Sequence, residues 1–439
     1  MLTRLDLRGT ADVAGALARP DDDADATEDR DQALAAVREI LAAVRRGGDA
    51  AVRELTLRFD GCDLADPRVP AADLQAALQA IPVALRTALE LAAARIREYH
   101  ALQTDVAEPV LDRDGVSLRE VAVPIGRAGL YVPGGRATYP STVLMTAIPA
   151  QLAGVDDLVL SVPPAADGRV PDATLAAAAL IGITEVVRIG GAQAIAALAY
   201  GTETVRPVDV IVGPGNRYVA LAKREVAGRV GIESFAGPSE VVVVADGTVP
   251  AMFAAADLLA QAEHGPGGAA VLVTWDPAVV DATEEAIDRL LADAPRRDDI
   301  TATLRSGGRA VLVDDALAAL DAVNVIAPEH LELLIDDPDA LLPLVRNAGA
   351  VFLGPWSPAA LGDYVAGVNH VLPTDRSARF ASALRVDTFR KHIHIVRATE
   401  EGLAALAPHI DAIAAAEGLD AHARSVDARS PLTVPGESS

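Results

Sequence analysis

The sequence predicts an α/β protein with two doubly wound sheet domains, one inserted into the other, and small helical segments at both ends. Three observations favour this class. From about residue 116 onward, short apolar runs closed by Gly or Pro alternate with helical stretches, which is typical of parallel βαβ units. Helical periodicity dominates before residue 100 and returns after residue 380. The 439 residues are enough for two or three domains of ~150 residues each.

Composition and charge exclude several classes of protein. Acidic residues outnumber basic ones by 62 to 38, and the net charge of −24 would repel nucleic acid and anionic lipid. The single cysteine, Cys62, allows neither a disulfide within the chain nor a thiolate zinc cage, which fits a reducing cytoplasm. No signal peptide begins the sequence, and no run of about 18 apolar residues follows. We therefore expect a cytoplasmic protein with no membrane or nucleic-acid partner.

The elements follow from the spacing of apolar residues. Leu34, Val37, Leu41 and Val44 recur at helical spacing, and two glycines end the pattern at residue 48. A last helix is expected at 400–417. Strands are expected at 157–162, 185–189, 208–212, 241–245, 270–274, 310–313 and 350–353.

The order of these elements predicts the domains. A new series of strands and helices begins after Pro238, so one sheet is expected to interrupt another. The predicted parts are an N-terminal segment (1–20), a discontinuous first α/β domain (21–130 and 239–383), an inserted α/β domain (131–238) and a C-terminal helical tail (384–439).

Two glycine turns, at residues 187–193 and 211–216, each join an apolar run to a helical stretch. Such turns bring backbone N–H groups and a helix N-terminus up to a phosphate. Neither has the full G-x-G-x-x-G pattern, and similar turns join strands to helices in proteins that bind no nucleotide. Gln193 and Asn216 add amide groups that suit a ribose or a carboxamide, or that cap helices.

Gln261 and His264 stand three residues apart near the end of an expected helix, so both side chains can reach one ion. Imidazole nitrogen and side-chain oxygen donors suit zinc, although such a pair is also common on ordinary protein surfaces. Asp363 follows a loop and is either a further ligand or a turn residue. His422 follows the last helix and is either a ligand or an exposed side chain.

Glu329 and His330 stand side by side at an element boundary. A glutamate and an imidazole can share proton transfer near neutral pH. The alternative is the start of a helix, where a glutamate favours the N-terminal dipole.

Together these segments resemble the histidinol dehydrogenases. The matching motifs follow one another between about residues 30 and 430, and the resemblance implies that the sheets are incomplete and Rossmann-like. The motifs are 129–135 (GLYVPGG), 141–145 (STVLM), 190–198 (GGAQAIAAL), 213–216 (GPGN), 236–240 (AGPSE), 261–266 (QAEHGP), 327–331 (APEHL) and 369–374 (NHVLPT).

The resemblance implies a role for each matching position. The implied cofactors are zinc and NAD, and Glu417 and His422 would complete the active site of a partner subunit in a homodimer. The implied zinc ligands are Gln261, His264, Asp363 and His422. The implied catalytic pair is Glu329 and His330, and the implied NAD contacts are Tyr131, Gln193 and Asn216. The implied substrate contacts are Ser239, Gln261, His264, His330, Asp363, Glu417 and His422.

The implied reaction takes L-histidinol to L-histidinal and then to L-histidine with two NAD, the final steps of histidine biosynthesis. Zinc would hold the substrate, His330 would remove the hydroxyl proton, and Glu329 would activate water. Cys62 lies far in sequence from every motif, so we expect an aldehyde hydrate rather than an enzyme thioester.

Three alternatives remain at this stage. One is a zinc- and NAD-dependent dehydrogenase of another small alcohol, such as a sulfonated diol, although Glu329 and Glu417 suit a cationic substrate better. Another is a zinc hydrolase that uses Glu329 and no NAD. The third is a metal-binding module without catalysis, in which the Glu329–His330 pair has no use.

Overall fold

The computed structural model describes residues 1–10, 12–17, 24–104, 108–134, 137–234, 237–265 and 267–429, with the backbone alone at 24–28. Of the motif residues, Gly135, Ala236 and Pro266 lie outside the described residues, as do residues 18–20 of the expected N-terminal segment and 430–439 of the expected tail. The chain divides into two compact units. The first is Met1–Thr104 with Ile125–Phe389, and the second is Asp105–Pro124 with Arg390–Ser439.

One sheet of the first unit has, in the described part of the chain, five parallel strands in the order β6-β5-β4-β7-β8. The chain begins at β4, moves outward through β5 to β6, and returns to the other side of β4 as β7. This reversal makes a topological switch point between β4 and β7, where open α/β sheets bind ligands beyond the carboxyl ends of the strands. The strands are β4 (Arg127–Tyr131), β5 (Asp157–Ser161), β6 (Glu185–Val187), β7 (Val210–Val212) and β8 (Gly231–Ile232).

The second sheet repeats this strand order and adds β1 at one edge. Its described strands are all parallel and have the order β1-β11-β10-β9-β12-β13. Both sheets are therefore Rossmann-like, as predicted. The strands are β1 (Thr3–Asp6), β9 (Glu240–Ala245), β10 (Ala269–Thr274), β11 (Gly308–Leu312), β12 (His330–Leu334) and β13 (Ala350–Leu353).

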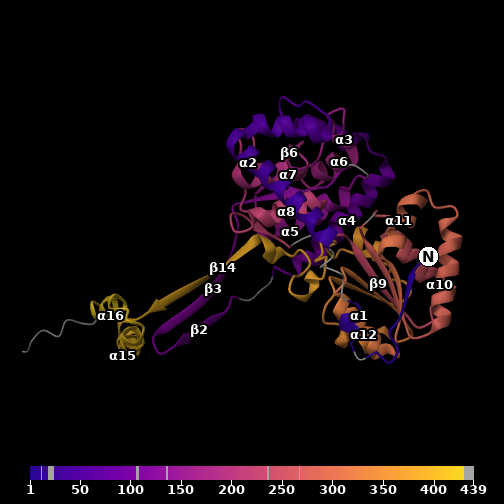
Figure 1. Cartoon of the computed structure of the whole chain (residues 1–439). Coiled ribbons are helices and arrows are strands. Elements are labelled where there is room, and N and C mark those ends of the chain that lie inside the picture. Colours follow the sequence, from indigo (N-terminus) through magenta and orange to yellow (C-terminus); the bar gives the residue numbers. More distant parts are fainter. Residues whose placement is uncertain are drawn as a thin grey trace, which may run out of the picture. The chain divides into compact units, whose positions relative to one another are not determined.

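Helices cover both faces of this second sheet (Figure 1). Val241 and Val243 of β9 pack against α9, α10 and α11, whereas Val242 and Val244 pack against α12. A central strand that is buried on both faces needs a continuous apolar run, which explains the four successive valines. The helices are α1 (Val13–Ala16), α9 (Ala251–Ala262), α10 (Pro277–Leu291), α11 (Arg297–Gly307), α12 (Ala316–Ile326), α13 (Pro338–Leu341), α14 (Ala359–Tyr364) and the 3-10 turns η1 (Leu342–Leu344), η2 (Ser377–Arg379) and η3 (Val386–Phe389).

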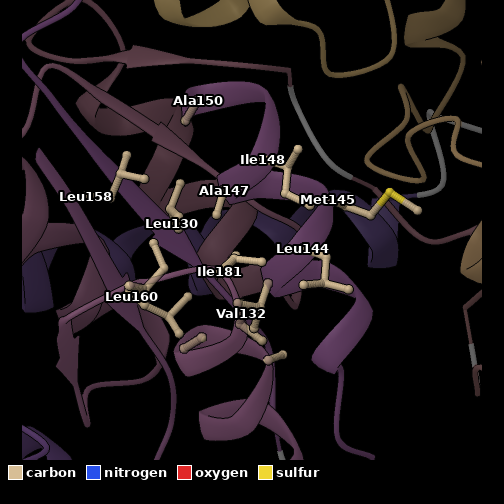
Figure 2. Packing of buried hydrophobic residues seen from close by; sticks show 14 of the residues in the cluster. Leu130, Val132, Leu144, Met145, Ala147, Ile148, Ala150, Leu158, Leu160 and Ile181 are labelled. Carbon is tan, nitrogen blue, oxygen red and sulfur yellow. The ribbon is translucent and has the colours of Figure 1, made fainter. Parts of the chain in front are cut away.

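The five-stranded sheet is also covered on both faces. Leu130 and Leu160 of its strands pack with Leu144 and Ile148 of α5 on one face, as Figure 2 shows, and all four are fully buried. Each such side chain contributes about 1.5–3 kcal/mol. The helices are α3 (Ala71–Ala80), α4 (Val83–Ala101), α5 (Pro140–Ala153) and α6 (Asp172–Leu180) on this face, and α2 (Ala24–Asp60), α7 (Gly191–Tyr200) and α8 (Arg217–Val226) on the other.

The expected end of the first helix at Gly48 is a break within α2 rather than its end. Gly48 has φ 52° and ψ −136°, which interrupts the helix, but helical structure resumes at once and continues to Asp60. Among the described residues, no single helix is long and apolar enough to span a bilayer, and one pair, α3 and α4, passes that test only together, bent by 112°.

The described residues of the second unit form three antiparallel strands in the order β14-β3-β2 and two helices. The expected helix at 400–417 is confirmed as α15. Two expectations were wrong. The segment from residue 116, expected to start a series of parallel units, is the second strand of an antiparallel hairpin, and the tail, expected to be helical, contains the strand β14. The elements are β2 (Val110–Arg113), β3 (Val116–Pro124), β14 (Arg390–Ala398), α15 (Glu400–Glu417) and α16 (Asp420–Asp427).

The domain boundaries at residues 131 and 238 stay a prediction. In the structure, however, the helices before residue 104 pack against a different sheet from the one that the sequence analysis assigned to them. The sequence placed residues 21–130 with 239–383, whereas α2, α3 and α4 share buried clusters with the five-stranded sheet. β1, in the expected N-terminal segment, is an edge strand of the other sheet. An amphipathic pattern shows which face of a helix is buried but not which sheet buries it.

Candidate active site

Glu329 and His330 stand at the amino end of β12, directly after α12. Ala327 ends that helix in the left-handed region (φ 51°), and the chain then enters the sheet. Both side chains are buried, with 7% of Glu329 and 3% of His330 exposed. The alternative of a helix start at these residues is therefore wrong.

Two neighbours hold the Glu329 carboxylate. Its Oε2 accepts a hydrogen bond from the Ser239 hydroxyl and another, at 3.1 Å, from the Glu240 N–H. Burial raises the pKa of Glu329, against the opposing effects of His330, Ser239 and the Glu240 amide. A carboxyl group whose pKa is shifted toward neutrality suits proton transfer at neutral pH.

The His330 ring lies between two carboxylates. Its Nδ1 donates to the Glu240 carbonyl oxygen at 3.2 Å and lies 3.7 Å from Glu329 Oε2, while its Nε2 lies 3.5 Å from Asp363 Oδ1. Burial lowers the His330 pKa, but the two carboxylates outweigh burial and raise the pKa to about 9. In this arrangement the ring is a cation at neutral pH, paired with Glu329 and Asp363.

Gln261 and His264 lie together at the end of α9, as their spacing predicts. Gln261 is buried in the last turn, and its Nε2 lies 3.4 Å from Nδ1 of His264, which is exposed just beyond the helix. Asp363 lies in the short helix α14 rather than in a turn. Burial raises its pKa, but His330, His370 and His264 outweigh burial and lower the pKa, so the carboxylate faces three imidazoles.

These side chains offer an amide oxygen, an imidazole nitrogen and a carboxylate from one unit of the chain. This donor set fits zinc, which takes nitrogen and oxygen ligands in a tetrahedral arrangement. Within the described residues, no three His, Cys, Asp or Glu side chains form a group that could hold a metal ion. A zinc site here would therefore need the Gln261 amide and a ligand from elsewhere.

Glu417 and His422 belong to the second unit. Glu417 is the last residue of α15, His422 lies in α16, and both are exposed. Their expected role in a partner's active site stays a prediction.

Tyr131 joins the two glycine turns at the switch point of the five-stranded sheet. It is the last residue of β4, and its hydroxyl accepts a hydrogen bond from the Gly191 N–H at 3.1 Å. Gly213, directly after β7, has φ +120°, and a Cβ there would lie 1.9 Å from the Tyr131 carbonyl oxygen. Only glycine allows this close approach of the two strand ends.

The two predicted amides lie on either side of this point. Gln193 is buried near the start of α7, and its Nε2 donates to Asp60 Oδ2 at 3.5 Å. Asn216 is exposed, and its Oδ1 caps α8 by accepting from the N–H groups of Tyr218 and Val219. The capping interpretation is thus confirmed for Asn216, while contact of either amide with NAD stays a prediction.

Sequence reasoning missed three groups of acids and bases. Asp60 lies beside Gln193, and burial raises its pKa to about 6. Glu332 of β12 is fully buried and hydrogen-bonds the Asp257 carboxyl group; burial and Asp257 raise the pKa of Glu332 to about 9. Lys223 and Glu233 form a buried ion pair. The sequence feature that could have identified Glu332 is a charged residue inside an apolar run.

Cys62 is buried at the turn after α2, and burial raises the pKa of its thiol. The thiolate is the reactive form of cysteine, so this environment disfavours a nucleophile.

A switch point flanked by two glycine turns on one Rossmann-like sheet and a buried acid–base pair on the other are together typical of an α/β dehydrogenase. Comparison with known proteins supports this class and narrows it. The family model for histidinol dehydrogenase matches residues 24–430. A histidinol dehydrogenase of Moorella thermoacetica is 49% identical over 402 residues, which cover 91% of this chain and 95% of the relative. One of Rhizobium meliloti is 50% identical over 404 residues, or 92% and 93% of the two chains.

A solved structure agrees. The crystal structure of histidinol dehydrogenase from Elizabethkingia anophelis matches with a TM-score of 0.90 and 36% identity, and the match covers 98% of both chains. The chain belongs to the histidinol dehydrogenase family. The family prediction and the dehydrogenase class are therefore confirmed.

Proposed function

We propose that this chain oxidises L-histidinol through L-histidinal to L-histidine with two molecules of NAD, the final steps of histidine biosynthesis. The observation that carries the proposal is the buried Glu329–His330 pair beside Asp363, in a chain whose relatives are named histidinol dehydrogenases. Two successive oxidations need one group that accepts a hydroxyl proton and one that activates water, and these two side chains match both needs.

The proposal includes two cofactors and a partner. NAD would bind at the switch point, near Tyr131 and the two predicted amides, where the N-termini of α7 and α8 favour its phosphates. Zinc would be held by Gln261, His264, Asp363 and His422 of the partner subunit, and it would bind the amine and imidazole nitrogens of the substrate. The working form would be a cytoplasmic homodimer.

His330 serves the first oxidation. Its Nδ1 proton is committed to the Glu240 carbonyl, so Nε2 is the atom that accepts the hydroxyl proton while hydride leaves the carbinol carbon for NAD. This requires a neutral ring. A positive partner for Asp363 other than His330 would weaken the effect by which this carboxylate raises the His330 pKa, and it would free Nε2.

Glu329 serves the second oxidation. Its carboxylate takes a proton from water as the water oxygen bonds to the aldehyde carbon, and the proton returns to the former carbonyl oxygen to give the hydrate. The hydrate then gives its hydride to the second NAD while His330 Nε2 accepts a hydroxyl proton, which leaves the carboxylic acid. The Ser239 hydroxyl and the Glu240 N–H hold the carboxylate in one orientation. The buried thiol of Cys62 supports this hydrate route over a thioester.

The test is to supply zinc-loaded protein with histidinol and NAD and to count the products. We expect two NADH for each histidine. One NADH with release of the aldehyde, or turnover only with a sulfonated diol, would contradict the proposed function. Turnover without NAD would support the hydrolase alternative, in which the two glycine turns have no use.

A further inference from the structure

A buried ion pair lies directly under the second glycine turn. Lys223 of α8 places its Nζ 2.6 Å from both carboxylate oxygens of Glu233, and the two side chains are only 1% and 4% exposed. Lysine is almost never buried unless it is paired. Removing two charges from water is costly and offsets most of their mutual attraction, so a buried pair is a weak source of stability. Its position therefore calls for another explanation.

Both members of the pair also bind Gly213. The Gly213 N–H donates to Glu233 Oε1 at 2.8 Å, and Lys223 Nζ donates to the Gly213 carbonyl oxygen at 3.0 Å. Both polar backbone groups of one residue are thus held by opposite charges. On its other side, Gly213 touches the backbone of Tyr131 so closely that no side chain fits. The peptide groups at Gly213 are fixed from both sides.

Gly213 begins the turn 213–216, which joins β7 to the first residue of α8. The turn ends at Asn216, whose side chain caps that helix. Rotation of the Gly213 peptide groups would move both the turn and the first N–H groups of α8, which are the groups that a phosphate would meet. The ion pair therefore fixes the backbone at the switch point itself, and not in a remote part of the sheet.

We propose that Lys223 and Glu233 are positioning residues that hold the turn 213–216 in the conformation that binds NAD. This inference rests on the proposed function, because it takes NAD to bind at this switch point. Neither residue needs to touch the cofactor. Their effect passes through the backbone of Gly213.

The test is the double variant Lys223→Met/Glu233→Leu, which replaces the pair by apolar side chains of similar volume. Such replacements of buried ion pairs often preserve folding. The variant removes both hydrogen bonds to Gly213, so we expect the Kd for NAD, measured by calorimetry without histidinol, to rise about tenfold or more, which corresponds to about 1.4 kcal/mol. The Kd for zinc should stay within about twofold of the wild-type value.

Two further variants keep the inference falsifiable. Glu233→Asp keeps the charge pair but shortens the reach of the carboxylate to the Gly213 N–H, so it should also weaken NAD binding. It serves as the test if the double variant fails to fold. Glu225→Gln is the matched control, because Glu225 lies on the same helix in an ion pair with the exposed Arg38. We expect the control to bind NAD like the wild type.

The outcomes separate this inference from the proposed function. Folded variants that bind NAD as tightly as the wild type would overturn the inference, as would an equal loss of zinc and NAD affinity. A wild-type chain that binds NAD but does not oxidise histidinol would overturn the proposed function alone. A wild-type chain that binds no NAD would overturn both.

Discussion

Glu329→Gln should slow the second oxidation far more than the first. Glutamine keeps the volume of the buried side chain and can still accept hydrogen bonds from Ser239 and the Glu240 N–H, but it cannot take a proton from water. General-base catalysis contributes roughly 10²–10⁴-fold, so oxidation of histidinal should fall by about that factor.

The first oxidation should keep its base. At the 3.7 Å between Glu329 Oε2 and His330 Nδ1, the attraction is roughly 4 kcal/mol at an effective dielectric constant of about 20. Its loss lowers the pKa of His330 and leaves more of the ring neutral, while Nδ1 still donates to the Glu240 carbonyl. We expect oxidation of histidinol to histidinal to change by about tenfold or less.

The assay is single-turnover formation of NADH, started either from histidinol or from histidinal with enzyme in excess. The matched control is Glu285→Gln, which makes the same change at an exposed position of α10 outside every motif and should leave both rates unchanged. Equal slowing of both oxidations by Glu329→Gln would refute the separate role of Glu329 in activating water.

Three further predictions follow from buried groups. The pKa of Glu332 is raised in the fold from 4.5 to about 9, so the stability that its protonation supplies is complete below about pH 4.5 and is lost as the pH rises through 9. Glu332→Gln should lose less stability than the wild type between pH 5 and 9 in urea unfolding, and parallel curves would contradict this. Gly213→Ala places a Cβ against the Tyr131 carbonyl at a positive φ, so the free energy of unfolding should fall by about 1–3 kcal/mol and NAD binding should weaken. The control is Gly228→Ala, at φ +92° in open space, which should keep NAD binding. Equal NAD affinities in the two variants would argue against the close approach. Cys62→Ala should leave both oxidation rates within about twofold, and loss of the second alone would point to a thioester.

The parallel sheets could be predicted because their strands are buried on both faces and appear as continuous apolar runs. All seven expected strands exist with ends shifted by at most a few residues. β12 was missed because the buried Glu332 interrupts its apolar run. β14 was missed because Ile393 and Ile395 alternate with histidines, the pattern of a half-solvated antiparallel strand, in a segment that was expected to be helical.

The site was predictable only where its residues are close in sequence. Gln261 and His264 meet because a helix places residues three apart on one face. Ser239 and Glu329 are 90 residues apart and meet because β9 and β12 pair with His330 opposite Val241. The register of two parallel strands does not follow from either strand alone, so the resemblance implied a role for each residue but the sequence did not predict their contact.

The two sheets share a strand order, but the sites that we propose on them lie at opposite edges, and helix dipoles explain the difference. The switch point that we assign to NAD lies at carboxyl strand ends, where α7 and α8 present positive N-termini to phosphates. Glu329 and His330 stand at an amino strand end, the edge to which α9 returns with its negative C-terminus beside Gln261 and His264. That end of a helix favours cations. A sulfonate placed there would meet Glu329, Asp363 and the negative helix end, so this edge suits zinc and a cationic amino alcohol better than an anionic substrate.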